Sequence, residues 1–152
     1  MNSGDLPQSW QALQNPTHLE ELMNLFGHFH DACVREIHAV TGHYVHENLS
    51  ITVDWRTTVH MLIQRQYRPL SAIELRFEGV VGMRLSAPPP DCESIIIDAA
   101  FFIRDDIIYW ADSSYWSPES SSESTWVAAR EVYWRDVSEW LGPRLRYRHN
   151  TE

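Results

Sequence analysis

Residues 72–86 alternate between apolar and charged side chains over most of their length. The apolar side chains that share one face are Ile73, Leu75, Phe77, Val81, Met83 and Leu85. The charged side chains that share the other face are Glu74, Arg76, Glu78 and Arg84. This period of two predicts a β-strand in a sheet with one buried and one solvent-facing side. The stretch is longer than a typical strand, so Gly79 or Gly82 is expected to mark a bulge or a bend.

The same period predicts further strands along most of the chain. They are expected at about 29–40, 43–46, 49–55, 58–67, 94–104, 107–111 and 125–135. In 94–104 the residues expected to share one face are Ile95, Ile97, Ala99, Phe101 and Ile103. Asp105-Asp106 predicts a tight hairpin turn, and Thr41-Gly42 is expected to separate 29–40 from the next short strand.

A helix is predicted before the first strand. Thr17 and Glu20 have the spacing of a capping box, in which each side chain satisfies a free backbone N–H at a helix start. Gly27 is expected to end the helix. The apolar residues that then recur at helical spacing are Leu19, Leu22, Met23 and Phe26. They predict a helix with one apolar stripe, suited to covering one face of a sheet.

These elements predict an α+β fold that is mainly β, with the N-terminal helix packed on a curved antiparallel sheet of six to eight strands. Residues 1–152 are expected to form a single domain, because 152 residues fit one ordinary core. Residues 1–16 are expected to be irregular, with Trp10 and Leu13 as anchors onto the domain.

Residues 112–125 (DSSYWSPESSSEST) are expected to form a serine-rich surface loop. Trp116 in its middle leaves two interpretations open: a lid that folds over a ligand, or a loose insertion with one docked aromatic side chain. Near the C-terminus, 144–149 (RLRYRH) is expected to be a last strand whose arginines pair with nearby carboxylates.

The formal charge of -9 limits the classes of partner. Nucleic-acid affinity comes chiefly from neutralised phosphates, so the charge argues against DNA or RNA as the main ligand. It also argues against an anionic membrane surface and favours a basic protein partner. All basic residues other than histidine are arginine, which excludes lysine-centred chemistry such as a Schiff base.

Cys33 and Cys92 lie far apart and form no metal-binding or redox spacing. The N-terminus lacks the basic and apolar regions of a signal peptide, and the longest apolar runs are too short to span a bilayer. We therefore expect free, mostly buried thiols and a cytoplasmic location.

Five histidines fall within residues 28–46, with Asp31 and Glu36 among them. Imidazole and carboxylate are natural ligands for zinc or iron, so this cluster is a candidate metal site. The spacing matches no firm motif, and the alternative is that the histidines lie on the half-wet rim of a hairpin. The candidate metal ligands are His28, His30, His43 and His46, and His38 is expected near His43 or His46 across the Thr41-Gly42 turn.

No catalytic residue is assigned. Asp31 and Cys33 are expected to share a buried face, with Asp31 accepting backbone hydrogen bonds. Glu74 and Glu78 would lie about 13 Å apart along a strand, too far for a glycosidase pair. With Arg76 between them they predict a charge ladder, which Asp98, Arg104, Glu131 and Arg135 are expected to extend. The candidate binding residues are His30, Asp31, Glu74, Arg76, Glu78, Trp110 and Trp116.

Two patches resemble a family of small, uncharacterised bacterial proteins. They are Phe26–Val45 (FGHFHDACVREIHAVTGHYV) and Ile63–Val80 (IQRQYRPLSAIELRFEGV), which match an F-H-D corner and an A-I-E-L-x-F-E-G strand. The family implies no settled activity. The corner of Phe29, His30 and Asp31 also resembles the start of some immunity proteins of bacterial toxin systems.

The leading hypothesis is therefore a non-enzymatic, acidic protein-binding module, specifically a toxin-neutralising immunity protein without a cofactor. One alternative is a metal-dependent or small-ligand-binding enzyme that uses the His28–His46 cluster with a divalent metal. Another is a structural protein that self-associates through an exposed aromatic sheet face, for example as a homodimer.

Overall fold

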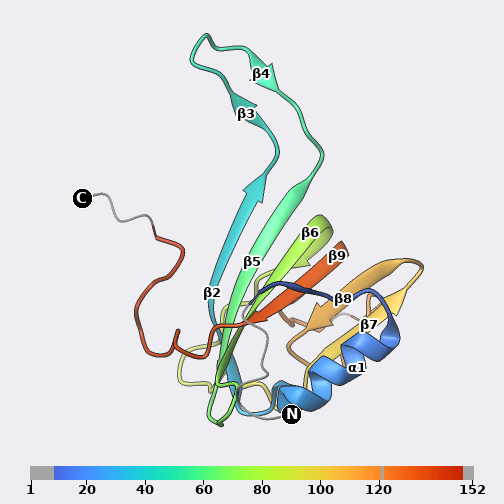
Figure 1. Ribbon diagram of the computed structural model, residues 1–152, viewed down its shortest axis with the longest axis vertical. Helices are drawn as coiled ribbons and strands as arrows, with labels where there is room; N and C mark the ends of the chain where they lie inside the picture. The colour runs from blue at the N-terminus through green and yellow to red at the C-terminus, as the bar shows by residue number, and fades with distance from the viewer. Residues whose placement is uncertain (1–8, 121, 149–152) are drawn as a thin grey trace.

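The computed structural model describes residues 9–120 and 122–148 and has the α+β, mainly β fold expected from the sequence (Figure 1). A seven-stranded antiparallel sheet has the order β2-β5-β6-β9-β8-β7, and β1 pairs with β9 beside that path. The strands of this sheet are β1 Gln11–Ala12, β2 Ala32–Thr41, β5 Thr57–Arg65, β6 Ala72–Arg84, β7 Ala100–Arg104, β8 Ile107–Ala111 and β9 Trp126–Asp136. A separate two-stranded sheet contains β3 (Tyr44–Val45) and β4 (Ile51–Thr52).

The helix α1 (Pro16–Leu25) begins two residues before the expected start. Asn15 is its N-cap, because the Asn15 side chain accepts a hydrogen bond from the backbone N–H of His18 at 2.9 Å. The Thr17–Glu20 capping box was therefore wrong, and Pro16 occupies the first helical turn, where no N–H is needed. Gly27 lies just past the end with φ +59°, which confirms it as the stop. A one-turn 3-10 helix, Gly27–Phe29, follows.

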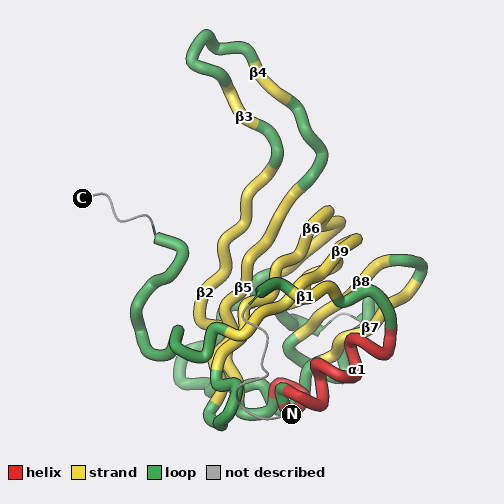
Figure 2. The backbone as a smooth tube through the Cα atoms, in the orientation of Figure 1, coloured by secondary structure: helices red, strands yellow, loops and turns green. Residues whose placement is uncertain are grey.

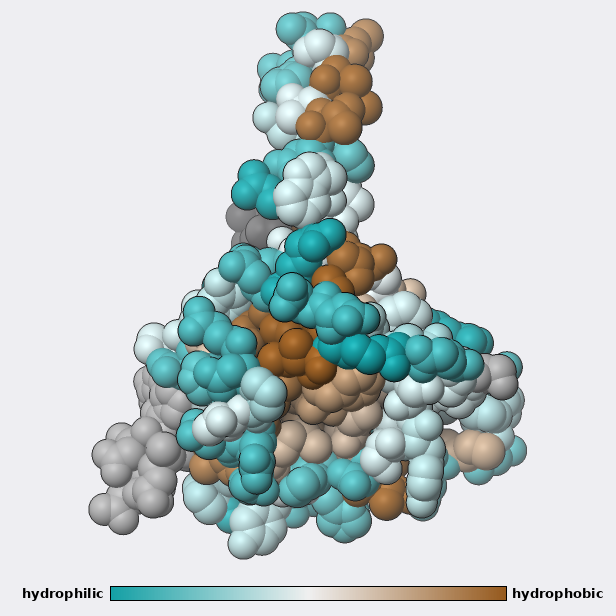
Figure 3. Space-filling model, turned by 90° about the vertical axis from the view of Figure 1, so that its right-hand side faces the viewer, coloured by the Kyte–Doolittle hydropathy of each residue, from teal (hydrophilic) through white to brown (hydrophobic). Residues whose placement is uncertain are grey.

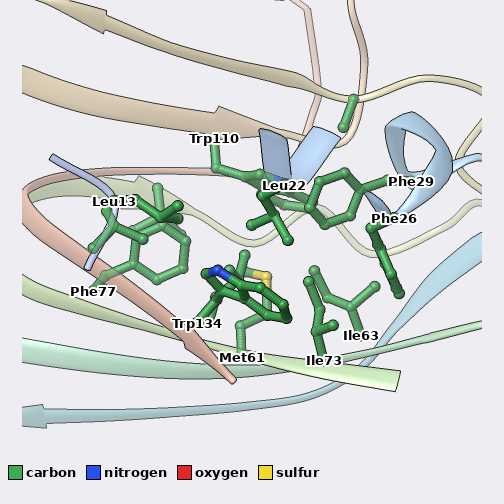
Figure 4. Close-up of a cluster of buried hydrophobic side chains, with 14 of the residues drawn as sticks. Leu13, Leu22, Phe26, Phe29, Met61, Ile63, Ile73, Phe77, Trp110 and Trp134 are labelled. Atoms are coloured by element: carbon green, nitrogen blue, oxygen red, sulfur yellow. The ribbon is translucent and has the colours of Figure 1, made fainter. Parts of the chain in front are cut away.

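The core lies between α1 and one face of the sheet, which we call the inner face (Figures 2 and 4). The expected helix stripe is buried there at Leu19, Leu22 and Phe26. The largest aromatic side chains of the core pack edge to face. Their ring centroids are 5.0 Å apart for Phe26–Phe29 and 5.8 Å apart for Phe29–Trp110. Trp110 is fully buried, so this candidate binding residue is part of the core.

The strand β6 contains the expected bulge, and the bulge changes which residues face the core. Gly79 has φ +63°, and the register with β9 shifts between Val80 and Gly82. Val80 and Met83 pack against the core as a result. Val81 and Leu85, which the strict alternation placed with the buried set, are exposed.

The expected strand 94–104 is regular only from Ala100 onward. Before it, Ile96 forms an isolated bridge with Ala32 and is buried, whereas Ile95 and Ile97 are exposed. The assignment of Ile95 and Ile97 to the buried face was therefore wrong. The Asp105-Asp106 turn between β7 and β8 is confirmed, and both residues have positive φ, as a tight hairpin turn requires.

Both cysteines are free, as expected, but both are exposed, so the expectation of buried thiols was wrong. Asp31 and Cys33 do share a face, but that face is exposed, and buried Ala32 between them points the other way. Across the described residues, none of the helices is long and apolar enough to cross a membrane.

Candidate functional site

A hairpin projects from the body of the molecule (Figures 1 and 3). We call residues 42–56, which contain β3 and β4, the finger. The chain does not reverse at Thr41-Gly42 as expected. Instead it turns at 46–50, where the N–H of His46 donates to Ser50 and the N–H of Leu49 donates to His46, both at 2.8 Å. His38 therefore pairs with His60 of β5 and not with His43 or His46.

Polar contacts hold the conformation of the finger. His46 Nε2 lies 2.6 Å from the Thr52 hydroxyl, across the β3–β4 pair. At the base, the backbone N–H of Asp54 donates to His43 Nδ1 at 3.2 Å, and Arg56 pairs with the Asp54 carboxylate at 3.1 Å. Hydrogen bonds from Arg56 lower the pKa of Asp54. These contacts are needed because an isolated two-stranded hairpin is only marginally stable in water.

The finger exposes a dense set of large apolar side chains. Leu49 at the tip is 84% exposed and Trp55 at the base is 69% exposed. The others are Tyr44, Val45, Ile51 and Val53. In Figure 3 hydrophobic side chains lie along one side of the finger, and a second hydrophobic area lies in the middle of the visible face of the body. Exposed apolar side chains gathered on a projecting element are a feature of protein–protein and membrane interaction sites, which makes the finger a candidate contact surface.

A groove of about 600 Å³ lies where the finger joins the sheet, between Val40 and Trp55 on one side and Glu78 and Glu131 on the other. Glu78 of β6 and Glu131 of β9 lie directly opposite each other. Like charges in that arrangement repel, although Arg76 Nε pairs with Glu78 at 2.9 Å.

The face of the sheet opposite α1, which we call the outer face, is partly covered by residues 137–148. We call this segment the C-terminal strap. It is not the last strand expected at 144–149, of which residue 149 lies outside the described residues. Trp140, Leu141 and Tyr147 of the strap pack on a small apolar cluster on the outer face. That cluster contains Leu62 and Ala72 of the sheet and Val137 at the start of the strap.

Buried Glu74 fixes the strap to the sheet. Its carboxylate, 2% exposed, accepts hydrogen bonds from Arg135 Nε at 2.7 Å and from the Tyr147 hydroxyl at 2.8 Å. His60 Nδ1 lies 3.1 Å from it. Burial opposes ionisation of Glu74, but the hydrogen bonds from His60, Tyr147 and Arg135 outweigh it and lower the pKa. Burial and the Glu74 charge raise the pKa of Tyr147, so its hydroxyl keeps its proton and donates a hydrogen bond to the carboxylate.

Aromatic and arginine side chains alternate across the outer face in a cation–π ladder. Trp10 lies between two guanidinium groups, with its ring centroid 4.4 Å from Arg76 and 4.6 Å from Arg135. The complete order is Tyr133, Arg76, Trp10, Arg135, Trp140 and Arg146. The ladder joins the N-terminal segment, the sheet and the strap, and confirms Trp10 as an anchor. Leu13, the other expected anchor, is buried in the core.

The charge ladder expected from sequence exists in part. Glu74, Arg76 and Glu78 share the outer face, and Arg135 and Glu131 lie opposite Glu74 and Glu78. Glu74 is buried, so this face is not an ordinary solvated one. Two expected members lie elsewhere: Asp98 is near His28, and Arg104 pairs with Glu119.

The structure separates the candidate metal ligands. His28 and His30 lie at the corner before β2, where His30 is 3.4 Å from the Asp31 carboxylate, whereas His43 and His46 lie on the finger beyond the other end of β2. Within residues 9–120 and 122–148, no three histidine, cysteine, aspartate or glutamate side chains gather in a way that could hold a metal ion.

Trp116, another candidate binding residue, is buried and docks the 112–125 loop onto the sheet. Its ring stacks on Trp126 at 5.2 Å and lies 5.9 Å from Tyr109. This arrangement matches the interpretation of an insertion with one docked aromatic side chain.

Sequence reasoning missed the finger, the strap and the ladder. The alternation in 43–55 indicated the finger strands but not that they leave the sheet. The arginine and tryptophan content was a weak signal for the ladder, because its members come from separate segments.

Comparison with protein-family models, curated proteins and solved structures found no match for this chain.

Proposed function

We propose that this chain is a non-enzymatic protein-binding module whose main contact surface is the finger, and that it acts as a toxin-neutralising immunity protein. The observation that carries the proposal is the exposure of Leu49, Ile51, Val53 and Trp55 on a projecting hairpin. Burying such side chains against a partner is favourable by roughly 25 cal/mol per Å² of apolar area. The cost of ordering the surface is small because hydrogen bonds already fix the finger.

The charge of the chain supports a basic partner. The formal charge is -9, and opposite net charge on the partner would speed encounter. Glu74, the most buried carboxylate of the outer face, is fully engaged by Arg135, Tyr147 and His60, so it supports a structural role and not acid–base chemistry.

Affinity capture from native lysate, followed by mass spectrometry, tests the proposal when wild-type protein is compared with the Ile51→Ser/Val53→Ser variant. The control is Val81→Ser, which removes an exposed apolar side chain outside the finger. We expect wild type and the control to retain one basic protein that the double variant loses. Production of that protein alone should then inhibit growth of a test host, and co-production of this chain should restore growth.

Retention of the same proteins by all three chains would remove the finger as the contact surface. A captured partner that does not inhibit growth would leave a protein-binding module but remove the immunity role.

A further inference from the structure

We infer that the partner adds a strand of its own to the free edge of β2 at residues 37–41. This inference rests on the proposed function and specifies how the partner docks. The strand β2 is at one end of the sheet order, and its pairing in the described part of the chain is with β5 and, at Ala32, with Ile96. An exposed strand edge presents a row of unpaired N–H and C=O groups that can accept an extended segment.

The hydrogen-bond pattern identifies which residues of β2 face outward. The carbonyl of Ala32 accepts from Ile96, away from β5, and its register partner Arg65 donates its N–H to Ser71, away from β2. Bonded and non-bonded pairs alternate along an antiparallel ladder. Following the register past the bulge, the residues whose N–H and C=O groups point outward are Ile37, Ala39 and Thr41.

The rest of β2 is protected against strand addition. At residues 37–41 the described part of the strap contacts a side chain and not the strand edge, with the Tyr147 ring 5.8 Å from the His38 ring. A bulge interrupts the strand between Val34 and Glu36. The strap lies beside it, since Arg35 donates to the Pro143 carbonyl and Glu36 accepts the N–H groups of Arg146 and Tyr147. The opposite edge, β7, has five residues and ends at Arg104. Residues 37–41 (IHAVT) contain no proline, glycine, lysine or acid, the usual guards of an edge.

A second copy of this chain fits the edge poorly. Symmetric antiparallel pairing centred on Ala39 would direct the finger of each copy, which continues from β2, against the strap of the other copy (Figure 1). The formal charge of -9 on each copy would also oppose association. The occupant that fits is a segment of a different, basic protein, with apolar side chains at alternate positions and basic ones between them.

A defined peptide tests this mode of binding. The probe is a nine-residue peptide of alternating lysine and valine, and the control peptide has glycine in place of each valine. The protein variants are Ala39→Pro, which removes an outward N–H and blocks pairing but is compatible with an edge strand, and Ala39→Ser as its matched control. Binding is measured by fluorescence anisotropy, and amide hydrogen exchange is followed by NMR.

We expect the valine peptide to slow exchange at Ile37, Ala39 and Thr41 in the wild type, and to bind the Ala39→Pro variant at least about tenfold more weakly than Ala39→Ser. Equal binding of the two peptides, protection confined to other residues, or protection that depends on protein concentration without peptide would each overturn the inference. If the captured partner is lost by the finger variant but binds Ala39→Pro normally, strand addition fails and the proposed function stands. If both the finger variant and Ala39→Pro retain the captured partner, strand addition and the proposed function both fail.

Discussion

The hydroxyl of Tyr147 donates a hydrogen bond to the buried carboxylate of Glu74 at 2.8 Å, and this contact joins the strap to the central strand β6. The two residues are far apart in sequence, and the sequence pattern that singles out Glu74 gives no sign of its contact with Tyr147. A hydrogen bond to a charged group contributes more than a neutral one, about 1.5–3 kcal/mol.

Replacing Tyr147 with phenylalanine removes that donor and keeps the ring. We expect the free energy of unfolding to fall by about 1.5–3 kcal/mol, because Glu74 loses one of the groups that stabilise its charge. Urea denaturation measures the change. The control is Tyr115→Phe, which alters an exposed tyrosine and should leave stability unchanged; equal effects would contradict the assignment of Tyr147 as an anchor.

The lowered pKa of Glu74 predicts an acid-dependent loss of stability. A carboxyl whose folded pKa lies below its unfolded value of about 4.3 stabilises the fold above that pH. The stabilisation is lost as the pH falls through the lower, folded-state pKa. In denaturation at stepped pH values, Glu74→Gln should be less stable than the wild type at pH 7 and should lose less stability on acidification. The exposed-site control Glu20→Gln should follow the wild-type curve.

The cation–π ladder predicts that Trp10 stabilises the fold. Trp10→Leu removes its contacts with Arg76 and Arg135, each worth about 0.5–2 kcal/mol. The midpoint temperature of thermal unfolding should therefore fall by several degrees. Trp55→Leu changes a tryptophan that is largely exposed and should shift it little. A larger effect at Trp55 would mean that the finger, not the ladder, is the structural element.

The bulge in β6 predicts that substitutions at two adjacent valines have different effects on the free energy of unfolding. Val80 packs on the core, so Val80→Ala should cost about 1–2 kcal/mol. Val81 is exposed, so Val81→Ala should change the free energy of unfolding by less than about 0.5 kcal/mol. Guanidinium denaturation measures the free energy of unfolding of both variants. A larger loss for Val81→Ala than for Val80→Ala would place the bulge elsewhere.

Local patterns predicted the parts of the fold that depend on local interactions. Gly27 ended the helix, and Ile73 and Phe77 marked a buried strand face, because turn chemistry and side-chain alternation act over a few residues. The register shift between Val80 and Gly82 was not predictable in detail, since a glycine permits a bulge without fixing which neighbour turns outward.

The candidate site was harder to predict for a different physical reason. Val45 and Ile51 lie at strand positions typical of buried residues, but nothing in the described part of the chain forms a second layer over the finger, so both are exposed. In the sequence, Glu74 has the pattern of a solvent-facing charge. In the structure it is buried because the strap places Tyr147 over it. Both outcomes depend on contacts between segments distant in sequence.

Removal of the finger tests whether the finger is the surface that contacts the partner. In the register of the structure, Val40 lies opposite Thr58, so an Asn-Gly turn joining these residues in place of 41–57 should close the β2–β5 hairpin and preserve the core. Titration calorimetry with the captured basic partner should then give no measurable binding, while urea denaturation stays cooperative. Undiminished affinity in this shortened chain would show that the partner binds a surface other than the finger.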